Sequence, residues 1–119
     1  IRFLGWRDDV GSLLAAADLL VCPSRHEPLG NVVLEAWARQ VPIVAAASQG
    51  PSELIVDGET GLLAPVDDAR ALSRQIKCVL DDRDAAVKMT LRALDAYERD
   101  FSRDTIVGQF KTLFEEVTR

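Results

Sequence analysis

The sequence has few of the residues from which metal and redox sites are built. Its 119 residues include one histidine and two cysteines. Cys22 and Cys78 lie far apart and form no Cys-x-x-Cys pattern, which predicts free thiols in a reducing compartment. The aspartate pairs at 8–9, 67–68 and 81–82 are explained as helix caps and solvated helix ends, and no histidines or cysteines have the spacing of metal ligands. We therefore expect no bound metal.

Three other common features are missing. Neither Gly-x-Gly-x-x-Gly nor Gly-Lys-Ser/Thr occurs, which disfavours a dehydrogenase-type dinucleotide site and a P-loop. Lysine and arginine number 14 against 19 aspartates and glutamates, a net charge of −5, so nothing favours binding to nucleic acid or to an anionic membrane. Apolar runs break after a few residues, which predicts no signal peptide and no membrane segment. A small-molecule ligand in the cytoplasm fits this composition best.

Short apolar runs alternate with helical patterns, which is typical of a parallel sheet covered by helices on both faces. Strands are predicted at residues 2–4, 19–22, 42–46 and 61–64. Helices are predicted from 8 or 9 to 17, then at 30–40 and 51–56, followed by three charged amphipathic helices at about 68–80, 84–98 and 103–117. The last carries an apolar stripe that includes Phe110, Leu113, Phe114 and Val117. Residues 1–119 are thus predicted to form one Rossmann-like α/β domain of about four strands with additional C-terminal helices.

The segment from Ser24 to Glu35 joins a predicted strand to a predicted helix and carries most of the candidate site. A helix that opens at Gly30 presents unpaired N–H groups and the positive end of its dipole, where a diphosphate fits. Glu27 precedes this point, and Glu35 lies one turn into the helix on the same face as Asn31. The two carboxylates therefore flank the anion site, an arrangement that suits the hydroxyls of a sugar and of a ribose.

Other candidate residues lie just beyond the carboxyl ends of predicted strands, where open α/β sheets bind ligands. The backbone N–H groups of Gly30, Asn31 and Val32 are candidates for holding the phosphates, and the loop side chains beside them are Ser24, Arg25, His26 and Leu29. Trp6 is a candidate for stacking on a base. Each has a plainer alternative: Glu27 as a helix cap, Glu35 and His26 as solvated residues, Arg25 as cover for the rim, Ser24 as a turn residue and Trp6 as a packing residue.

Several ordered segments resemble the nucleotide-sugar-binding half of the retaining family 4 glycosyltransferases with the GT-B fold. They are Phe3-Leu4-Gly5, Ala17 to Ser24, Glu27-Pro28-Leu29-Gly30, Leu34-Glu35-Ala36, Val41 to Ala45 and Asp57 to Leu63. The resemblance implies that Glu27 is the catalytic residue facing the transferred sugar, and that Glu35 holds the ribose. It implies transfer of a glycosyl group from a UDP-, GDP- or ADP-sugar to an acceptor hydroxyl with retention, without a cofactor.

The sequence departs from this family at two turns. Gln40 stands where the family usually has glycine, so either Gln40 adopts a left-handed backbone at some cost or the turn differs. Gln49-Gly50-Pro51-Ser52-Glu53 replaces a Gly-Gly-x-Pro-Glu-like turn, so the loop's contact with sugar or phosphate is expected to differ.

The resemblance also implies a larger protein. Ile1 lies in what looks like a strand, so we expect further residues upstream, including an N-terminal acceptor domain and the basic residues that neutralise the diphosphate. The fragment alone is expected to be inactive. The implied acceptor is a glycan or a lipid-linked glycan, and the expected location is cytoplasmic, with the rest of the protein reaching the inner face of the membrane.

Two alternatives stay open at this stage: a sugar-nucleotide epimerase of GT-B architecture, and a nucleotide-binding module without catalysis. A glycoside hydrolase is disfavoured, because its two carboxylates must face each other about 5 to 10 Å apart across a sugar. In this sequence Glu27 and Glu35 flank an anion site instead.

Overall fold

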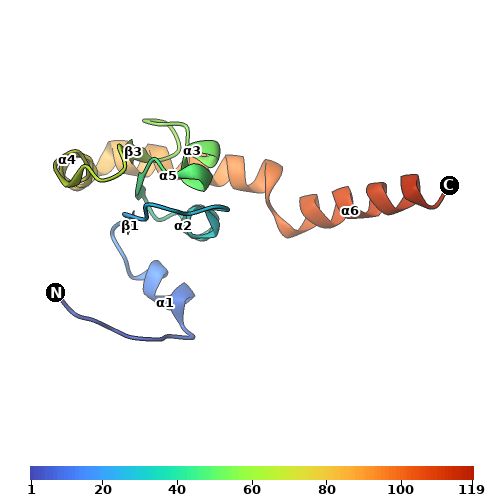
Figure 1. The fold of residues 1–119 in the computed structure, drawn as a ribbon, viewed down its shortest axis with the longest axis horizontal. Helices are drawn as coiled ribbons and strands as arrows, with labels where there is room; N and C mark the ends of the chain where they lie inside the picture. The colour runs from blue at the N-terminus through green and yellow to red at the C-terminus, as the bar shows by residue number, and fades with distance from the viewer.

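A three-stranded parallel sheet forms the centre of the molecule, which a computed structural model describes over residues 1–119 (Figure 1). Strands β1 (Leu20–Cys22), β2 (Ile43–Ala46) and β3 (Leu62–Ala64) lie in the order β1-β2-β3. The helices are α1 (Val10–Ala15), α2 (Asn31–Ala38), α3 (Gln49–Leu54), α4 (Ala69–Asp81), α5 (Arg83–Asp100) and α6 (Arg103–Val117). The predicted α/β architecture, with a parallel sheet and flanking helices, is confirmed.

Strand β2 lies in the middle of the sheet and is buried along its whole length. Because successive side chains of a strand point to opposite faces, β2 contributes to two packed layers. Ile43 and Ala45 belong to the larger one, with Trp37 of α2 and Ala93 of α5. Val44 packs on the other face with residues of α4 and α5. Covering of both faces explains the continuous apolar run from which the strand was predicted.

Trp37 anchors the larger layer and is only 2% exposed. Its indole N–H donates a hydrogen bond to the carbonyl oxygen of Thr60 at 3.0 Å, so the one polar atom of the ring is satisfied. Its ring also meets Phe101 edge to face, with centroids 6.4 Å apart. The tryptophan therefore joins α2 to the turn before β3 and to the end of α5.

The turn between α2 and β2 has a left-handed backbone, which is one of the two possibilities that the sequence left open. Gln40 has a φ of 54°, a region that residues other than glycine, asparagine and aspartate enter at a cost of about 1–2 kcal/mol. Its N–H donates to the carbonyl oxygen of Trp37 at 3.0 Å. The helix thus ends where the family's glycine would end it, with a residue that is strained there.

Two of the aspartate pairs act as helix caps, as predicted. Asp68 accepts a hydrogen bond from the N–H of Ala71 at 2.8 Å, and Asp82 accepts one from Ala85 at 2.9 Å. Asp9 makes no such bond to α1. Its carboxylate instead accepts from the Arg7 guanidinium at 2.6 Å, and this bond lowers the pKa of Asp9.

The predicted start of the third helix is wrong by two residues. α3 begins at Gln49 rather than at Pro51. The N–H groups of a first helical turn have no partner within the helix, so a proline in that turn forfeits no hydrogen bond. Pro51 is therefore accommodated inside α3 and does not mark its beginning.

The prediction of a strand at residues 2–4 is wrong for this chain. Residues 1–9 form no helix or strand, and the side chains of Ile1 and Phe3 are almost fully exposed. A strand needs a neighbour whose backbone groups bond to its own. No strand lies beside this segment, which runs apart from the sheet (Figure 1).

The last helix, α6, projects away from the sheet (Figure 1). No residue of α6 is buried, and the predicted stripe of Phe110, Leu113, Phe114 and Val117 is exposed. The rings of Phe110 and Phe114 stack on each other with centroids 6.3 Å apart. None of the helices is both long enough and apolar enough to cross a bilayer.

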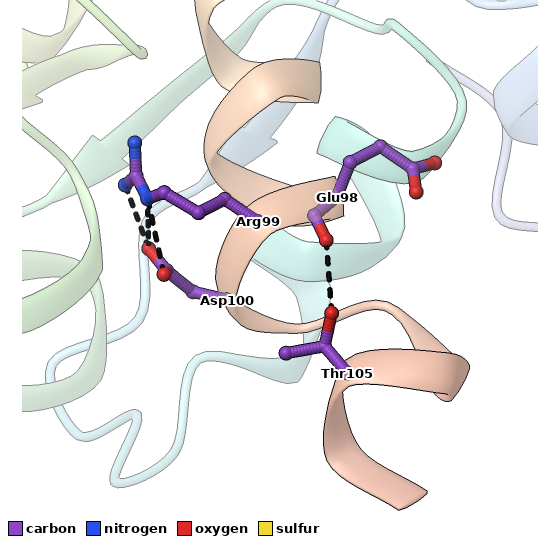
Figure 2. Close-up of polar contacts among 4 residues, drawn as sticks. All are labelled: Glu98, Arg99, Asp100 and Thr105. Atoms are coloured by element: carbon purple, nitrogen blue, oxygen red, sulfur yellow. Dashed lines mark hydrogen bonds and ion pairs between the residues drawn. The ribbon is translucent and has the colours of Figure 1, made fainter. Parts of the chain in front are cut away.

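Polar contacts fix the junction between α5 and α6 (Figure 2). The Thr105 hydroxyl donates to the carbonyl oxygen of Glu98 at 3.2 Å, and Ser102 caps α6 by accepting from the N–H of Thr105. Arg99 and Asp100 form an ion pair whose shortest N–O distance is 2.6 Å. This pairing lowers the pKa of the Asp100 carboxyl and raises that of Arg99.

Candidate functional site

The loop between β1 and α2, residues 23–30, lies at the carboxyl end of the sheet. It ends at Gly30, which is buried and has a φ of 69°, a conformation that favours glycine. A Cβ at this position would lie 2.9 Å from the Leu54 side chain and 3.2 Å from the backbone of Gly50. Glycine is therefore required at the start of α2 for two independent reasons, its backbone angle and the space around it.

Gly50 holds this loop from the neighbouring turn. Its N–H donates to the carbonyl oxygen of Glu27 at 2.7 Å. A Cβ on Gly50 would lie 2.5 Å from the nitrogen of Gly30 and 2.7 Å from that same carbonyl oxygen. Gly50 is not among the site residues predicted from the sequence, although its place just after β2, at the same edge of the sheet, is a signal that could have identified it.

Glu27 lies over the amino end of α2. Its Oε1 accepts a hydrogen bond from the N–H of Gly30 at 3.3 Å, which is the capping contact that the sequence left open as an alternative. A carboxylate is favourable there because the helix dipole is positive at that end. The same electrostatics would attract a phosphate, so Glu27 occupies part of the site in which an anion would bind.

The first N–H groups of α2 remain available. Asn31 and Val32 begin the helix, so their N–H groups have no acceptor within it, and no other backbone or side-chain group accepts from them. Of the three predicted phosphate-binding amides, that of Gly30 is engaged by Glu27 and these two are free.

Glu35 and Leu29 lie open to solvent on either side of this helix start. Glu35 is exposed and takes part in no ion pair. As the fourth residue after Asn31, it shares a helix face with that residue, as predicted. The Leu29 side chain is exposed just before Gly30, the residue that precedes the free amides.

Arg25 has a partner that the sequence did not indicate. Its Nε donates to the Asp67 carboxylate at 2.5 Å, across 42 residues of sequence. Asp67 lies between β3 and α4 and has a φ of 63°. Aspartate is one of the few residues other than glycine that enter this backbone region routinely.

The other loop residues differ in how firmly they are held. The Ser24 hydroxyl accepts a hydrogen bond from the Cys22 thiol at 3.6 Å. His26 is exposed and forms no hydrogen bond. The Trp6 side chain does not contact this loop. It is 97% exposed and belongs to residues 1–9, which form no helix or strand.

Two hollows can be compared as ligand sites. One of about 270 Å³ lies at the carboxyl ends of all three strands, where Pro23, Arg25, Ala46 and Asp67 are among its lining residues. A larger one of about 390 Å³ lies at the opposite edge, near Asp18, Gln40 and Arg83. Ligands of parallel sheets bind at the carboxyl edge, and the free amides of α2 lie there. We therefore assign the candidate site to the carboxyl edge. Histidine, cysteine and acidic side chains do not gather in groups of three that would hold a metal ion.

Comparison with known proteins identifies the family. A family model described as "Glycosyl transferases group 1" matches residues 1–82. The lipopolysaccharide core biosynthesis glycosyltransferase LpsE of Rhizobium meliloti (strain 1021) is 39% identical over 113 residues, which cover 95% of this chain and 33% of the relative. The N-acetyl-alpha-D-glucosaminyl L-malate synthase of Bacillus anthracis is 35% identical over 119 residues, covering 100% of this chain and 31% of the relative.

Solved structures agree with this result. The crystal structure of Anabaena Alr3699/HepE in complex with UDP matches with a TM-score of 0.90 and 32% sequence identity, over 97% of this chain and 32% of that one. The same protein has also been solved with UDP-glucose. The present chain spans about a third of the length of these relatives. Because the family model matches residues 1–82 and the fold matches at a TM-score of 0.90, the chain belongs to the group 1 glycosyl transferases and has a GT-B-like fold.

Proposed function

We propose that this chain is the donor-binding half of a retaining glycosyltransferase. Its part of the reaction is to hold a nucleoside diphosphate sugar while the glycosyl group passes to an acceptor hydroxyl. The observation that carries the proposal is the free N–H pair of Asn31 and Val32 at the start of α2, with Glu27 on one side and Glu35 on the other. Uridine is the favoured base, because the Anabaena relative has been crystallised with UDP and with UDP-glucose.

The contact between Glu27 and Gly30 defines how the donor would enter. A diphosphate at the start of α2 would take the N–H of Gly30, at present bonded to Glu27 over 3.3 Å. The carboxylate would turn toward the transferred sugar, where we assign it the catalytic role. Exposed Glu35 would accept hydrogen bonds from the ribose hydroxyls, and Leu29, Ser24 and His26 would line the donor. Trp6 would cover the base once its segment is held in place.

Charge stabilisation is the main chemical task of this site. As the bond between the anomeric carbon and the diphosphate breaks, negative charge grows on the leaving oxygen and positive charge on the sugar ring. The α2 amides and helix dipole would stabilise the first, and Glu27 the second. The acceptor hydroxyl oxygen then bonds to the anomeric carbon from the face that the diphosphate leaves, which gives retention, and its proton passes to the departing diphosphate oxygen. This design needs no metal or cofactor.

A second domain would supply the acceptor. The relatives are about three times as long as this chain, and two parts of the structure have no partner within it. These are the apolar segment at residues 1–6 and the exposed face of α6. We propose that an acceptor-binding domain packs against them and presents a glycan or a lipid-linked glycan in the cytoplasm, at the inner face of a membrane.

Calorimetric titration with UDP, GDP, ADP and UDP-glucose tests the proposal. Glu35→Ala is expected to weaken UDP binding about 5- to 100-fold, because it removes charged hydrogen bonds to the ribose. Glu27→Ala is expected to leave UDP binding equal or tighter, since it frees the N–H of Gly30, and to weaken the extra affinity of UDP-glucose. Glu115→Ala in exposed α6 is the matched control. Equal affinities of Glu35→Ala, Glu27→Ala and the control for UDP and for UDP-glucose would contradict the proposal. Conversion of UDP-glucose to another UDP-sugar without an acceptor would indicate an epimerase.

A further inference from the structure

We propose that Asp67 is a positioning residue for the donor site and acts through Arg25. The inference rests on the proposed function and adds a residue from a different part of the chain. Asp67 accepts the Arg25 Nε at 2.5 Å although 42 residues separate the two. Arg25 stands two residues before Glu27, so the ion pair reaches the loop that carries the proposed catalytic carboxylate.

Asp67 lies in a turn whose next residue is hydrogen-bonded on both sides. It is one of only two residues other than glycine with positive φ, at 63°. The residue after it, Asp68, bonds back to the Pro65 carbonyl at 3.2 Å and caps α4 through Ala71. The turn is thus fixed to the end of β3 on one side and to a helix of 13 residues on the other. Aspartate enters this backbone region readily, so the turn directs the Asp67 side chain toward Arg25 without a large conformational cost.

The loop at 23–30 is then held from two directions. From one side, Gly50 binds the Glu27 carbonyl oxygen at 2.7 Å. From the other, Asp67 binds the Arg25 side chain and forms with it part of the rim of the 270 Å³ hollow. If the Asp67 charge is removed, the Gly50 contact remains, and the part of the loop around Arg25 loses its second attachment. The position of the Glu27 carboxylate should become less defined.

A competing explanation predicts that donor affinity changes in the opposite direction when the Asp67 charge is removed. If Asp67 merely withholds Arg25 from the phosphates, removal of its charge would release a guanidinium to bind them, and donor affinity would rise. If Asp67 positions the loop, removal of its charge lowers donor affinity. The direction of the change therefore separates the two roles.

Asp67→Asn is the sharpest variant, because asparagine tolerates the left-handed backbone and keeps the shape while removing the charge. In the protein that contains this chain, we expect it to raise the Kd for UDP-glucose about two- to fivefold, the range of an exposed ion pair. Arg25→Ala should have the same effect, and the double variant should be no worse than either single one. Asp104→Asn in α6 is the matched control, and melting temperatures should not differ.

An unchanged or lower Kd in Asp67→Asn would overturn the proposal. The proposal would also be overturned if Asp67→Asn raised the Kd for UDP-glucose equally in wild type and in Arg25→Ala, because Asp67 would then not act through Arg25. Amide hydrogen exchange measured without ligand tests the loop attachment independently. The amides of residues 25–30 should exchange faster in Asp67→Asn than in wild type. Unchanged exchange rates would contradict the inference that the ion pair holds the loop. If the wild type binds no nucleoside diphosphate, the proposed function fails, while this exchange measurement still tests the loop attachment.

Discussion

The N–H of Gly50 donates to the carbonyl oxygen of Glu27 at 2.7 Å, which joins the turn after β2 to the loop after β1. This backbone contact determines how close α3 can lie to the start of α2. It also leaves no space for a side chain at position 50. The geometry of the candidate site therefore depends on a glycine that lies outside the loop between β1 and α2.

Gly50→Ala is expected to destabilise the fold by about 1–3 kcal/mol, because the new Cβ would meet backbone atoms of Gly30 and Glu27 that cannot move independently. Urea unfolding measures the change. Gly108→Ala is the matched control. Gly108 lies inside α6 with nothing within 4 Å of the added Cβ, so alanine should stabilise by about 0.5–1 kcal/mol. Equal effects of the two substitutions would refute the close approach at Gly50.

Gln40→Gly is expected to raise the free energy of unfolding by about 0.5–1 kcal/mol. The gain comes from relief of the left-handed backbone at a φ of 54°, reduced by the greater freedom of glycine in the unfolded chain. The same substitution at Gln109, inside α6, should cost about 1 kcal/mol relative to a good helix former. A loss of stability in Gln40→Gly would mean that the glutamine side chain contributes more than its backbone costs.

The ion pair between Arg99 and Asp100 is expected to make the stability of the protein depend on pH at the α5–α6 junction. Its hydrogen bond from Arg99 lowers the pKa of the folded carboxyl below its ordinary value. The pair therefore adds stability above about pH 4, where the unfolded carboxyl is ionised, and loses it as the pH falls through the lowered pKa. Thermal melts of wild type and Asp100→Asn should differ slightly at pH 6 and converge near pH 2. Because both side chains are largely exposed, 0.5 M salt should reduce the difference.

Local patterns were enough to predict most of the fold. Strands β1, β2 and β3 each followed from a short apolar run, and the left-handed turn at Gln40 was one of two possibilities drawn from the glycine usual at that place. The strand expected at residues 2–4 failed because a strand depends on a neighbour, and a local pattern does not report whether one is present. The apolar stripe on α6 shows the same limit of local patterns. Its spacing predicts the helix but does not report which surface, if any, covers the stripe.

The candidate site was predictable where it is contiguous in sequence. Glu27, Gly30, Asn31 and Glu35 lie within nine residues, so helix geometry alone relates them. Arg25 was left with two interpretations because its partner, Asp67, lies 42 residues away and is brought near only by the parallel order of the strands. Gly50 was missed for a related reason, since its close approach to Gly30 depends on how α3 packs.

Backbone amide signals followed by NMR while UDP is added test the diphosphate site at the start of α2 most directly. We predict that the N–H signals of Asn31 and Val32 shift most, because they are the free donors at the start of α2. The Gly30 signal should follow as phosphate replaces Glu27. Shifts confined to the opposite edge of the sheet, around Asp18 and Arg83, or no shifts at saturating UDP, would contradict a diphosphate site at this helix.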